Sequence, residues 1–337
     1  MNMFDKQATA IEPVTQSLLH SSLLTPVQRF VDGGGKRIRG ALTQLAYEMA
    51  GGRGEVPESI SVAIESLHAG SLVIDDIQDD SRFRRGQPTL HRQIGTPLAI
   101  NAGNWMYFHA LETLATAPFD CEVRGAMTMA MIQSARICHE GQAIDLAARV
   151  DELPASDWFA VAMQISEQKT GELVRLAMTL GGLAGGASRA LLAAMDRFGV
   201  CVGVTLQMRN DLDELAWLAN SQNAAQENVR DDDLRNARVT WPWTWIADAD
   251  PKLARNLSRI SITSREQSVD VAQSMLPKVA AMGEAAIGER LDRETRLLGE
   301  FVLQLNSFDL LEIVLQPIRF GKITSRPKQE LTDACSR

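Results

Sequence analysis

The sequence has few cysteines and no cysteine motif. Its 337 residues include four cysteines at scattered positions, without CxxC spacing: Cys121, Cys138, Cys201 and Cys335. This distribution argues against both a zinc site of clustered thiolates and a disulfide framework. We therefore expect a reducing compartment, the cytoplasm. The first residues agree with this expectation, because they lack the basic and apolar regions of a secretory signal.

Aromatic residues, net positive charge and long apolar runs are also scarce. Phe, Trp and Tyr make up 5% of the chain, and 34 Lys and Arg against 42 Asp and Glu give a net charge of −8. A protein that holds nucleic acid by neutralising phosphates would show the opposite balance, so we expect no nucleic-acid partner. The uncharged stretch at 93–111 carries several polar residues. We therefore expect no membrane span.

Hydrophobic residues, 45% of the chain, recur at intervals of three and four, which is typical of α-helices. Alternating strand patterns are almost absent. Short breaks such as those at 51–57 and 181–188 divide the pattern into many helices, and none has the length of an interdomain linker. These features predict one all-α domain over residues 1–320. Residues 321–337 lose the apolar period and are expected to form a peripheral tail.

The most informative segment contains a DDxxD motif after an apolar run. On a helix, Asp75, Asp76 and Asp79 would share one face within roughly 100°, with His68 in line two turns earlier. Like charges beside an apolar core are costly unless a cation compensates them. Mg²⁺ is typically held by one or two carboxylates together with substrate phosphates and water. For a single motif of this kind, a solvated acidic helix end is the alternative interpretation.

A second polar cluster follows another apolar run, in LQMRNDLDELAW. The residues that would share a helix face there are Gln207, Asn210, Asp211 and Glu214. Two such helices facing each other would surround a pocket with oxygen ligands. The second cluster therefore favours a metal site over a solvated helix end.

Basic residues stand close to both clusters. They are Lys36 and Arg39 after a glycine run, Arg84 and Arg85 after the first cluster, and Lys169 before Thr170. Each pair alone is a weak signal, and GGGK is not a nucleotide-binding loop. Together with the oxygen ligands they predict a site for two phosphorylated groups, one held through metal and one directly by Arg and Lys.

These motifs occur in the order seen in trans-isoprenyl diphosphate synthases. They are GGGKRIRG, the DDxxD at 75–79, RRGQPTLH, GQAIDL, KTG and LQMRND, and they extend from Gly33 to about Pro242. The chain resembles a short-chain member and is most similar to geranylgeranyl diphosphate synthases. The resemblance implies an all-α, isoprenoid-synthase-type helical bundle around a deep central cavity, usually a homodimer. It also implies Mg²⁺-dependent head-to-tail condensation of isopentenyl diphosphate with an allylic diphosphate, giving a product of about C20.

The resemblance also implies roles for individual residues. Three Mg²⁺ ions would be held with substrate by Asp75, Asp79 and Asp211, and Asn210 and Glu214 complete the second motif. The allylic diphosphate would lie near Arg84, Lys169, Thr170, Gln207 and Arg238. Isopentenyl diphosphate would be bound by Lys36, Arg39, His68 and Arg85. The residues we expect to be catalytic are Asp75, Asp76, Asp79, Lys169 and Asp211.

Product length depends on what lies below the first motif. A chain growing from the diphosphate would pass Gly70 and Ser71, which are too small to block it. Tyr107, Phe108 and His139 stand where similar geranylgeranyl-producing enzymes have the floor of the cavity. The alternative is that all five are ordinary packed residues.

The sequence departs from the family pattern in two places. The second motif begins Asn210-Asp211 instead of Asp-Asp, which removes one formal charge, and Ala237-Arg238 replaces the usual Gly-Lys. Two other functions therefore stay open. One is a class I terpene cyclase of the same fold, although its metal motif would need Ser or Thr at 214 and Glu at 218. The other is a non-catalytic or regulatory prenyl-diphosphate-binding subunit that has partly lost its second metal site.

Overall fold

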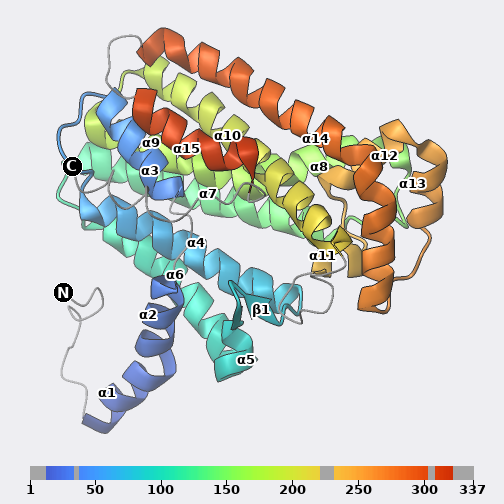
Figure 1. The fold of residues 1–337 in the computed structure, drawn as a ribbon. Coiled ribbons are helices and arrows are strands. Elements are labelled where there is room, and N and C mark those ends of the chain that lie inside the picture. Colours follow the sequence, from blue (N-terminus) through green and yellow to red (C-terminus); the bar gives the residue numbers. More distant parts are fainter. Residues whose placement is uncertain (1–12, 34–37, 221–230, 303–307, 322–337) are drawn as a thin grey trace.

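The computed structural model describes residues 13–33, 38–220, 231–302 and 308–321 (Figure 1). In chain order its helices are α1 (Pro13–Leu19), α2 (Thr25–Asp32), α3 (Ile38–Met49), α4 (Glu58–Gln78), α5 (Leu90–Ile94), α6 (Thr96–Ala115), α7 (Cys121–Ala147), α8 (Trp158–Ile165), α9 (Glu172–Gly185), α10 (Arg189–Ala219), α11 (Asp232–Arg235), α12 (Trp241–Ala249), α13 (Pro251–Leu257), α14 (Arg265–Val302) and α15 (Phe308–Phe320). Two π-helical turns, η2 (His20–Leu24) and η4 (Ser166–Gly171), and one 3₁₀ turn, η3 (Ala155–Asp157), adjoin these helices. The predicted all-α class is confirmed.

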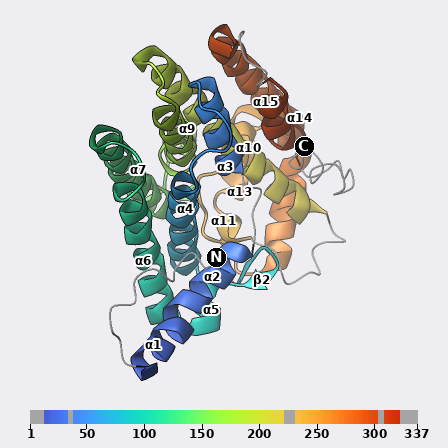
Figure 2. The same ribbon diagram turned by 90° about the vertical axis from the view of Figure 1, so that its left-hand side faces the viewer.

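The helices form a bundle built around α10. This helix packs against α9 and α14, while α4 packs against α6 and α3 against α9. Figure 2 shows α6 and α7 on one flank of the bundle and α14 and α15 on the other. The apolar run before the second motif is buried along α10, with Phe198, Val202 and Leu206 in the main core cluster. One consequence is that the polar end of α10 is held at a defined place inside the bundle.

A glycine lets α10 approach the turn η4 closely. A Cβ at Gly203 would lie 2.4 Å from the Cα of Gly171, a separation that no side chain could accept. The close contact brings the Lys169-Thr170 pair of η4 next to the residues one turn further along α10.

Among the described residues, the paired strands are β1 (Phe83–Arg84) and β2 (Gln87–Pro88), an antiparallel hairpin directly after α4. Its two turn residues, Arg85 and Gly86, have φ of 54° and 78°. Positive φ at both positions is the geometry of a type I′ turn, which matches the twist of a tight hairpin. The hairpin therefore folds the RRGQ motif back towards the acidic end of α4.

Helix α4 ends at Gln78, just before the last aspartate of the DDxxD motif. Asp79 follows the last helical residue, and Asp80 has a φ of 50°, a left-handed conformation that stops the helix. Aspartate tolerates this conformation better than most residues. Asp79 is therefore presented at a helix end.

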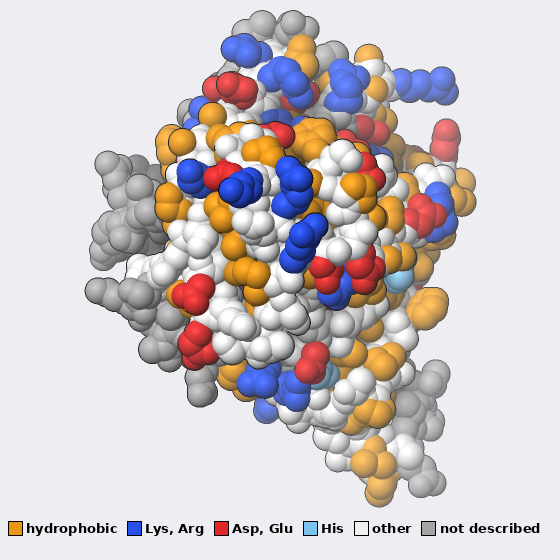
Figure 3. Space-filling view, turned by 90° about the vertical axis from the view of Figure 1, so that its right-hand side faces the viewer, with side chains coloured by type: hydrophobic (Ala, Val, Ile, Leu, Met, Phe, Trp, Pro, Cys, Tyr) orange, Lys and Arg blue, Asp and Glu red, His pale blue; other side chains and the backbone are white. Residues whose placement is uncertain are grey.

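Two further features bear on the predictions about partners. By length and composition α10 could cross a membrane, and 61% of its most apolar window is buried inside the bundle. On the face viewed in Figure 3, acidic and basic side chains are interspersed and do not form one continuous basic patch. Residues 322–337 of the predicted tail (321–337) lie outside the described residues, and the extent of the domain stays a prediction.

Candidate active site

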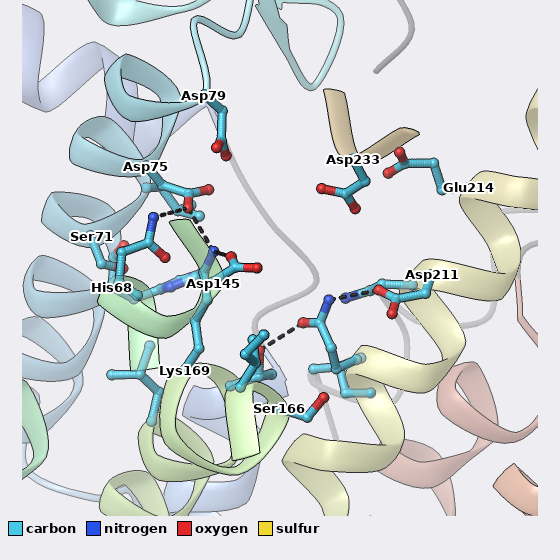
Figure 4. Close-up of a pocket in the computed structure, with 18 of the residues that line it drawn as sticks. His68, Ser71, Asp75, Asp79, Asp145, Ser166, Lys169, Asp211, Glu214 and Asp233 are labelled. Atoms are coloured by element: carbon cyan, nitrogen blue, oxygen red, sulfur yellow. Dashed lines mark hydrogen bonds and ion pairs between the residues drawn. The ribbon is translucent and has the colours of Figure 1, made fainter. Parts of the chain in front are cut away.

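A cavity of about 1180 Å³ lies between the two acidic helices. One wall carries Asp75 and Asp79 of α4, and the opposite wall carries Asn210, Asp211 and Glu214 of α10. Figure 4 shows the labelled carboxylates of both helices directed into the space between them. The two motifs, more than a hundred residues apart in the sequence, are thus brought face to face as predicted.

Lys169 and Arg238 form ion pairs with the two carboxylates of the first motif that face the cavity. The Lys169 Nζ lies 2.9 Å from Asp75 Oδ1 and 2.6 Å from Asp145 Oδ2. Arg238 is buried behind the cavity wall and places its Nη2 3.2 Å from Asp79 Oδ1, while its Nη1 donates to the backbone carbonyl of Asp145 at 2.8 Å. Asp145 thereby positions both Lys169 and Arg238. The sequence analysis quoted the GQAIDL motif but assigned no role to this residue.

The pKa values in this group show the effect of burial. Burial, and after it the neighbouring Asp75, raise the pKa of Asp79 to about 6, against the opposing effect of Lys169 and Arg238. Burial disfavours the Lys169 ammonium, but Asp75 and Asp145 outweigh this and raise its pKa. The site therefore holds a fixed cation beside carboxylates whose negative charge is only partly compensated.

Asp76 does not face the cavity, which corrects the prediction of three carboxylates on one face. Its side chain is 1% exposed and accepts two hydrogen bonds from the Nε of Arg84, at 2.9 and 2.8 Å. Consecutive helical residues point about 100° apart, so Asp75 and Asp76 face different neighbours. Asp76 instead holds Arg84, which does line the cavity.

In the second motif the carboxylate of Asp211 is buried, whereas the amide of Asn210 is exposed. Asp211 is buried, and its Oδ1 accepts a hydrogen bond from Gln207 Nε2 at 2.7 Å while its Oδ2 accepts one from the Trp241 backbone at 3.0 Å. Thr170 adds a further hydrogen bond to this series, because its hydroxyl donates to Gln207 Oε1 at 2.7 Å. Burial raises the pKa of Asp211 to about 8, and Asp233 contributes to the shift. Asn210 is the exposed member of the pair.

Asp233 is a cavity residue that the sequence analysis missed. It lines the cavity from α11 and lies across from Glu214 (Figure 4). Asp232 lines the cavity as well, but it forms an ion pair with Arg235, as Asp231 does. The run of three aspartates shortly before Arg238 is the signal that could have pointed to it.

The carboxylates fit a metal that is bound jointly with substrate. Within the described parts of the chain, no three His, Cys, Asp or Glu side chains come close enough to hold a metal ion by themselves. The oxygen ligands are instead divided between two facing walls. This arrangement suits Mg²⁺, which commonly takes one or two carboxylates and completes its shell with phosphate and water. The raised pKa values of Asp79 and Asp211 agree, since a divalent cation would supply the missing positive charge.

A second group of basic residues lines the same cavity. Arg39 Nη1 lies 3.1 Å from His68 Nε2, and Arg84 and Arg85 of the hairpin lie nearby along the wall. Burial lowers the pKa of His68 well below its usual value, and the three arginines lower it further. A neutral His68 therefore accepts the hydrogen bond from Arg39 and orients its guanidinium. Lys36, predicted to belong to this group, lies outside the described residues.

The predicted chain-length residues separate into two sets. Ser71, Tyr107 and His139 line the cavity, and the Tyr107 and His139 rings meet edge to face with centroids 5.5 Å apart. Gly70 faces α6, where a Cβ would lie 2.8 Å from the Gly103 carbonyl oxygen. Phe108 is 71% exposed, because one residue of helix rotates it away from Tyr107 to the outer face. Gly70 and Phe108 therefore do not line the cavity, and their effect on chain length stays a prediction.

The sequence is similar to proteins of one known family. Residues 20–278 match the family model of polyprenyl synthetase. The chain is 33% identical over 190 residues to a short-chain isoprenyl diphosphate synthase of Methanothermobacter thermautotrophicus, covering 56% of this chain and 57% of that protein. It is 30% identical over 205 residues to a geranylgeranyl pyrophosphate synthase of Geoglobus acetivorans, covering 60% and 62%. The chain thus spans less than two thirds of the length of these relatives.

The solved structures give the same result for the fold. The geranylgeranyl pyrophosphate synthetase of Pyrococcus horikoshii superposes with a TM-score of 0.71 at 23% identity, over 89% of this chain and 90% of that chain. At this identity the likeness concerns the fold. The family model, in contrast, matches well over half of the sequence. The chain belongs to the polyprenyl synthetase family.

Proposed function

We propose that this protein is a trans-prenyltransferase that joins isopentenyl diphosphate head-to-tail to an allylic diphosphate, giving a product of about C20. The observation that carries the proposal is a single cavity with two facing acidic helices and, beside them, Arg39, Arg84 and Arg85. A cavity of this kind suits two diphosphates, one bound through metal and one bound directly. Relatives named as geranylgeranyl pyrophosphate synthases support the product class.

Mg²⁺ would be held by Asp75 and Asp79 on one wall and by Asp211, Asn210 and Glu214 on the other, with three ions when substrate is bound. Bound there, it would neutralise the allylic diphosphate and make it a better leaving group.

The protein's own side chains would bind, orient and shield the substrates. Those near the allylic diphosphate are Arg84, Lys169, Thr170, Gln207 and Arg238, and those near isopentenyl diphosphate are Lys36, Arg39, His68 and Arg85. The allylic carbon–oxygen bond breaks with its electron pair leaving on diphosphate, and the isopentenyl double bond attacks the resulting cation. A proton then leaves the new chain to the departed diphosphate. The apolar walls would keep water from quenching the cation.

We further propose that the enzyme works as a homodimer in the cytoplasm. Helices α6 and α7 form one flank of the bundle, and their exposed apolar residues are Leu98, Ile100, Phe108, Met129 and Ile132. Exposed apolar side chains on two adjoining helices favour association. The three described cysteines are free thiols, in line with a reducing compartment.

The test is incubation of purified protein with Mg²⁺, isopentenyl diphosphate and allylic diphosphates of increasing length, with products identified by mass. We expect Asp75→Ala to lower turnover by several orders of magnitude, because it removes a carboxylate that acts while the leaving group departs. Asp270→Ala, which removes an exposed carboxylate of α14, is the matched control.

Other outcomes identify the alternatives. Hydrocarbon formed from an allylic diphosphate alone would indicate a terpene cyclase. Binding without turnover, with activity only after a partner chain is added, would indicate a regulatory subunit. An Asp75→Ala variant as active as the parent would overturn the assignment of the site.

A further inference from the structure

Arg209 is a fully buried charge directly before the second motif. Its side chain is 0% exposed, and it does not line the cavity. Burial of a guanidinium costs several kcal/mol unless nearly all of its donors are satisfied. The partners of Arg209 therefore show which elements this part of α10 depends on for its position.

All of its close hydrogen-bond partners belong to the last two helices of the described chain. Nε donates to the carbonyl of Ile318 at 2.9 Å, and Nη2 donates to the carbonyl of Arg319 at 2.8 Å. Nη1 and Nη2 also bind the two oxygens of Glu284 on α14, at 2.7 and 2.5 Å. One guanidinium thus joins α10, α14 and the end of α15.

The Arg209 guanidinium is chemically suited to the carbonyl groups at the end of α15. Ile318 and Arg319 lie in the last turn of α15, where carbonyls have no partner within the helix and carry the negative end of its dipole. The planar fork of arginine can reach two such carbonyls and a carboxylate at once, whereas a lysine ammonium cannot reproduce this geometry.

The end of α15 lies against the acidic turn of α10. Gly321, with a φ of 62°, follows the last residue of α15, and a Cβ there would lie 2.7 Å from Asp213 Oδ1. Arg209 Nη1 lies 3.6 Å from the same oxygen. Asp213 lines the cavity in the same helical turn as Asn210 and Glu214, so the contacts of Arg209 directly adjoin the second motif.

We propose that Arg209 is a positioning residue that clamps the acidic turn 210–214 between α14 and the end of α15, and so sets how tightly the second motif binds a divalent cation. The inference rests on the proposed function. Asn210 contributes no charge, so cation binding at this motif depends more strongly on where the remaining oxygens are placed.

The experiment compares Arg209→Met and Arg209→Lys with the parent. The probe is Mn²⁺ in the presence of inorganic diphosphate, followed by electron paramagnetic resonance. We expect Arg209→Met to lower the Mn²⁺ affinity of the second motif about tenfold, the usual order for losing a group that orients a ligand. The Mn²⁺ affinity of Arg209→Lys should lie between those of Arg209→Met and the parent. Asn210→Asp shows which Mn²⁺ sites belong to the second motif, because it should raise their affinity.

Arg175→Met is the matched control. Arg175 is a partly buried arginine whose Nε donates to Glu172 Oε2 at 2.8 Å, and it does not line the cavity. We expect this variant to lose stability but to bind Mn²⁺ as the parent does. If Arg209→Met unfolds, Glu284→Gln and Arg209→Lys provide the comparison, because each weakens the clamp while keeping a polar partner.

The results separate this proposal from the proposed function. Unchanged Mn²⁺ binding in all Arg209 and Glu284 variants, or an equal change in Arg175→Met, would overturn the positioning role. A parent that binds Mn²⁺ and diphosphate but condenses no isoprenoid would overturn the proposed function alone. In a condensing enzyme, Arg209→Met should raise the Mg²⁺ concentration for half-maximal rate and leave the KM for isopentenyl diphosphate unchanged.

Discussion

At the scale of single residues, neighbouring polar side chains in each motif take different tasks. Asp75 faces the cavity while Asp76 holds Arg84. Asn210 is exposed while Asp211 is buried and accepts two hydrogen bonds. A helix rotates about 100° per residue, so the two members of each pair meet different neighbours. Asp76 is held by Arg84 away from the cavity, whereas Asp211 lines the cavity and is held there by Gln207 and Trp241.

Asp211 leads to a prediction about pH and stability. Its pKa in the folded protein is about 8, above its ordinary value of 3.8, so between these values the folded state keeps a proton that the unfolded state releases. The free energy of unfolding of metal-free protein should fall with rising pH in this range, by up to about 1.4 kcal/mol per pH unit from this group. Urea unfolding in chelator at several pH values measures the slope.

Asp211→Asn should flatten that slope, because an amide does not titrate. Asp270→Asn, on the exposed side of α14, should leave it as in the parent. Equal slopes for parent and Asp211→Asn would mean that Asp211 is ionised in the folded protein at low pH.

Product length gives a second prediction at this scale. Ser71→Phe should shorten the product, because an aromatic ring would enter the cavity one turn below Asp75. Tyr107→Ala should lengthen it by opening the wall formed with His139. Ile260→Ala is the control, since this exposed side chain does not line the cavity and should not affect the distribution. Mass analysis of the products decides, and no change in either of the first two variants would mean that the chain grows elsewhere.

At the scale of elements, left-handed residues deliver cationic side chains to the site. Arg85 in the hairpin turn and Ala237 before Arg238 have φ of 54° and 52°. Ala237 stands where the family usually has glycine, and the chain keeps the left-handed turn at a cost of about 1–2 kcal/mol for an L-residue. The structure thus retains the path that brings Arg238 to Asp79.

The contact between α4 and α6 gives a prediction about packing. Gly70 lies against the Gly103 backbone, so Gly70→Ala would place a methyl group 2.8 Å from a carbonyl oxygen that cannot move by itself. We expect a loss of about 1–3 kcal/mol in the free energy of unfolding, the usual cost of overpacking. Gly288→Ala on α14, where a Cβ meets open space, should instead be neutral or stabilising by up to about 1 kcal/mol. Urea unfolding of both variants measures the difference, and equal effects would contradict this account of the contact.

At the scale of the whole molecule, the cavity and the exposed apolar flank lie on different parts of the bundle. The cavity opens between α4 and α10, whereas the flank is the outer side of α6 and α7 (Figure 2). Dimer formation through this flank would therefore leave the cavity between the two acidic motifs uncovered. This separation makes the proposed dimer testable without altering a site residue.

Met129→Glu combined with Ile132→Glu should convert the protein to a monomer, because each change places a charge in a desolvated contact. Size-exclusion chromatography with light scattering measures the mass. Ile260→Glu, at another exposed apolar residue, should leave the mass unchanged. A parent that is already monomeric, or a double variant that stays dimeric, would show that the flank is not the interface.

The helical class and the family follow from the sequence alone, because helical periodicity and motif order are local properties of the chain. The orientation of individual side chains depends on tertiary packing. Gly70 and Phe108 were predicted to line the cavity and do not, and Asp233 lines it from α11 without having been predicted. The physical reason is the same in each case. A residue's spacing gives its angle around its own helix, but which neighbour stands at that angle depends on helices far away in the sequence.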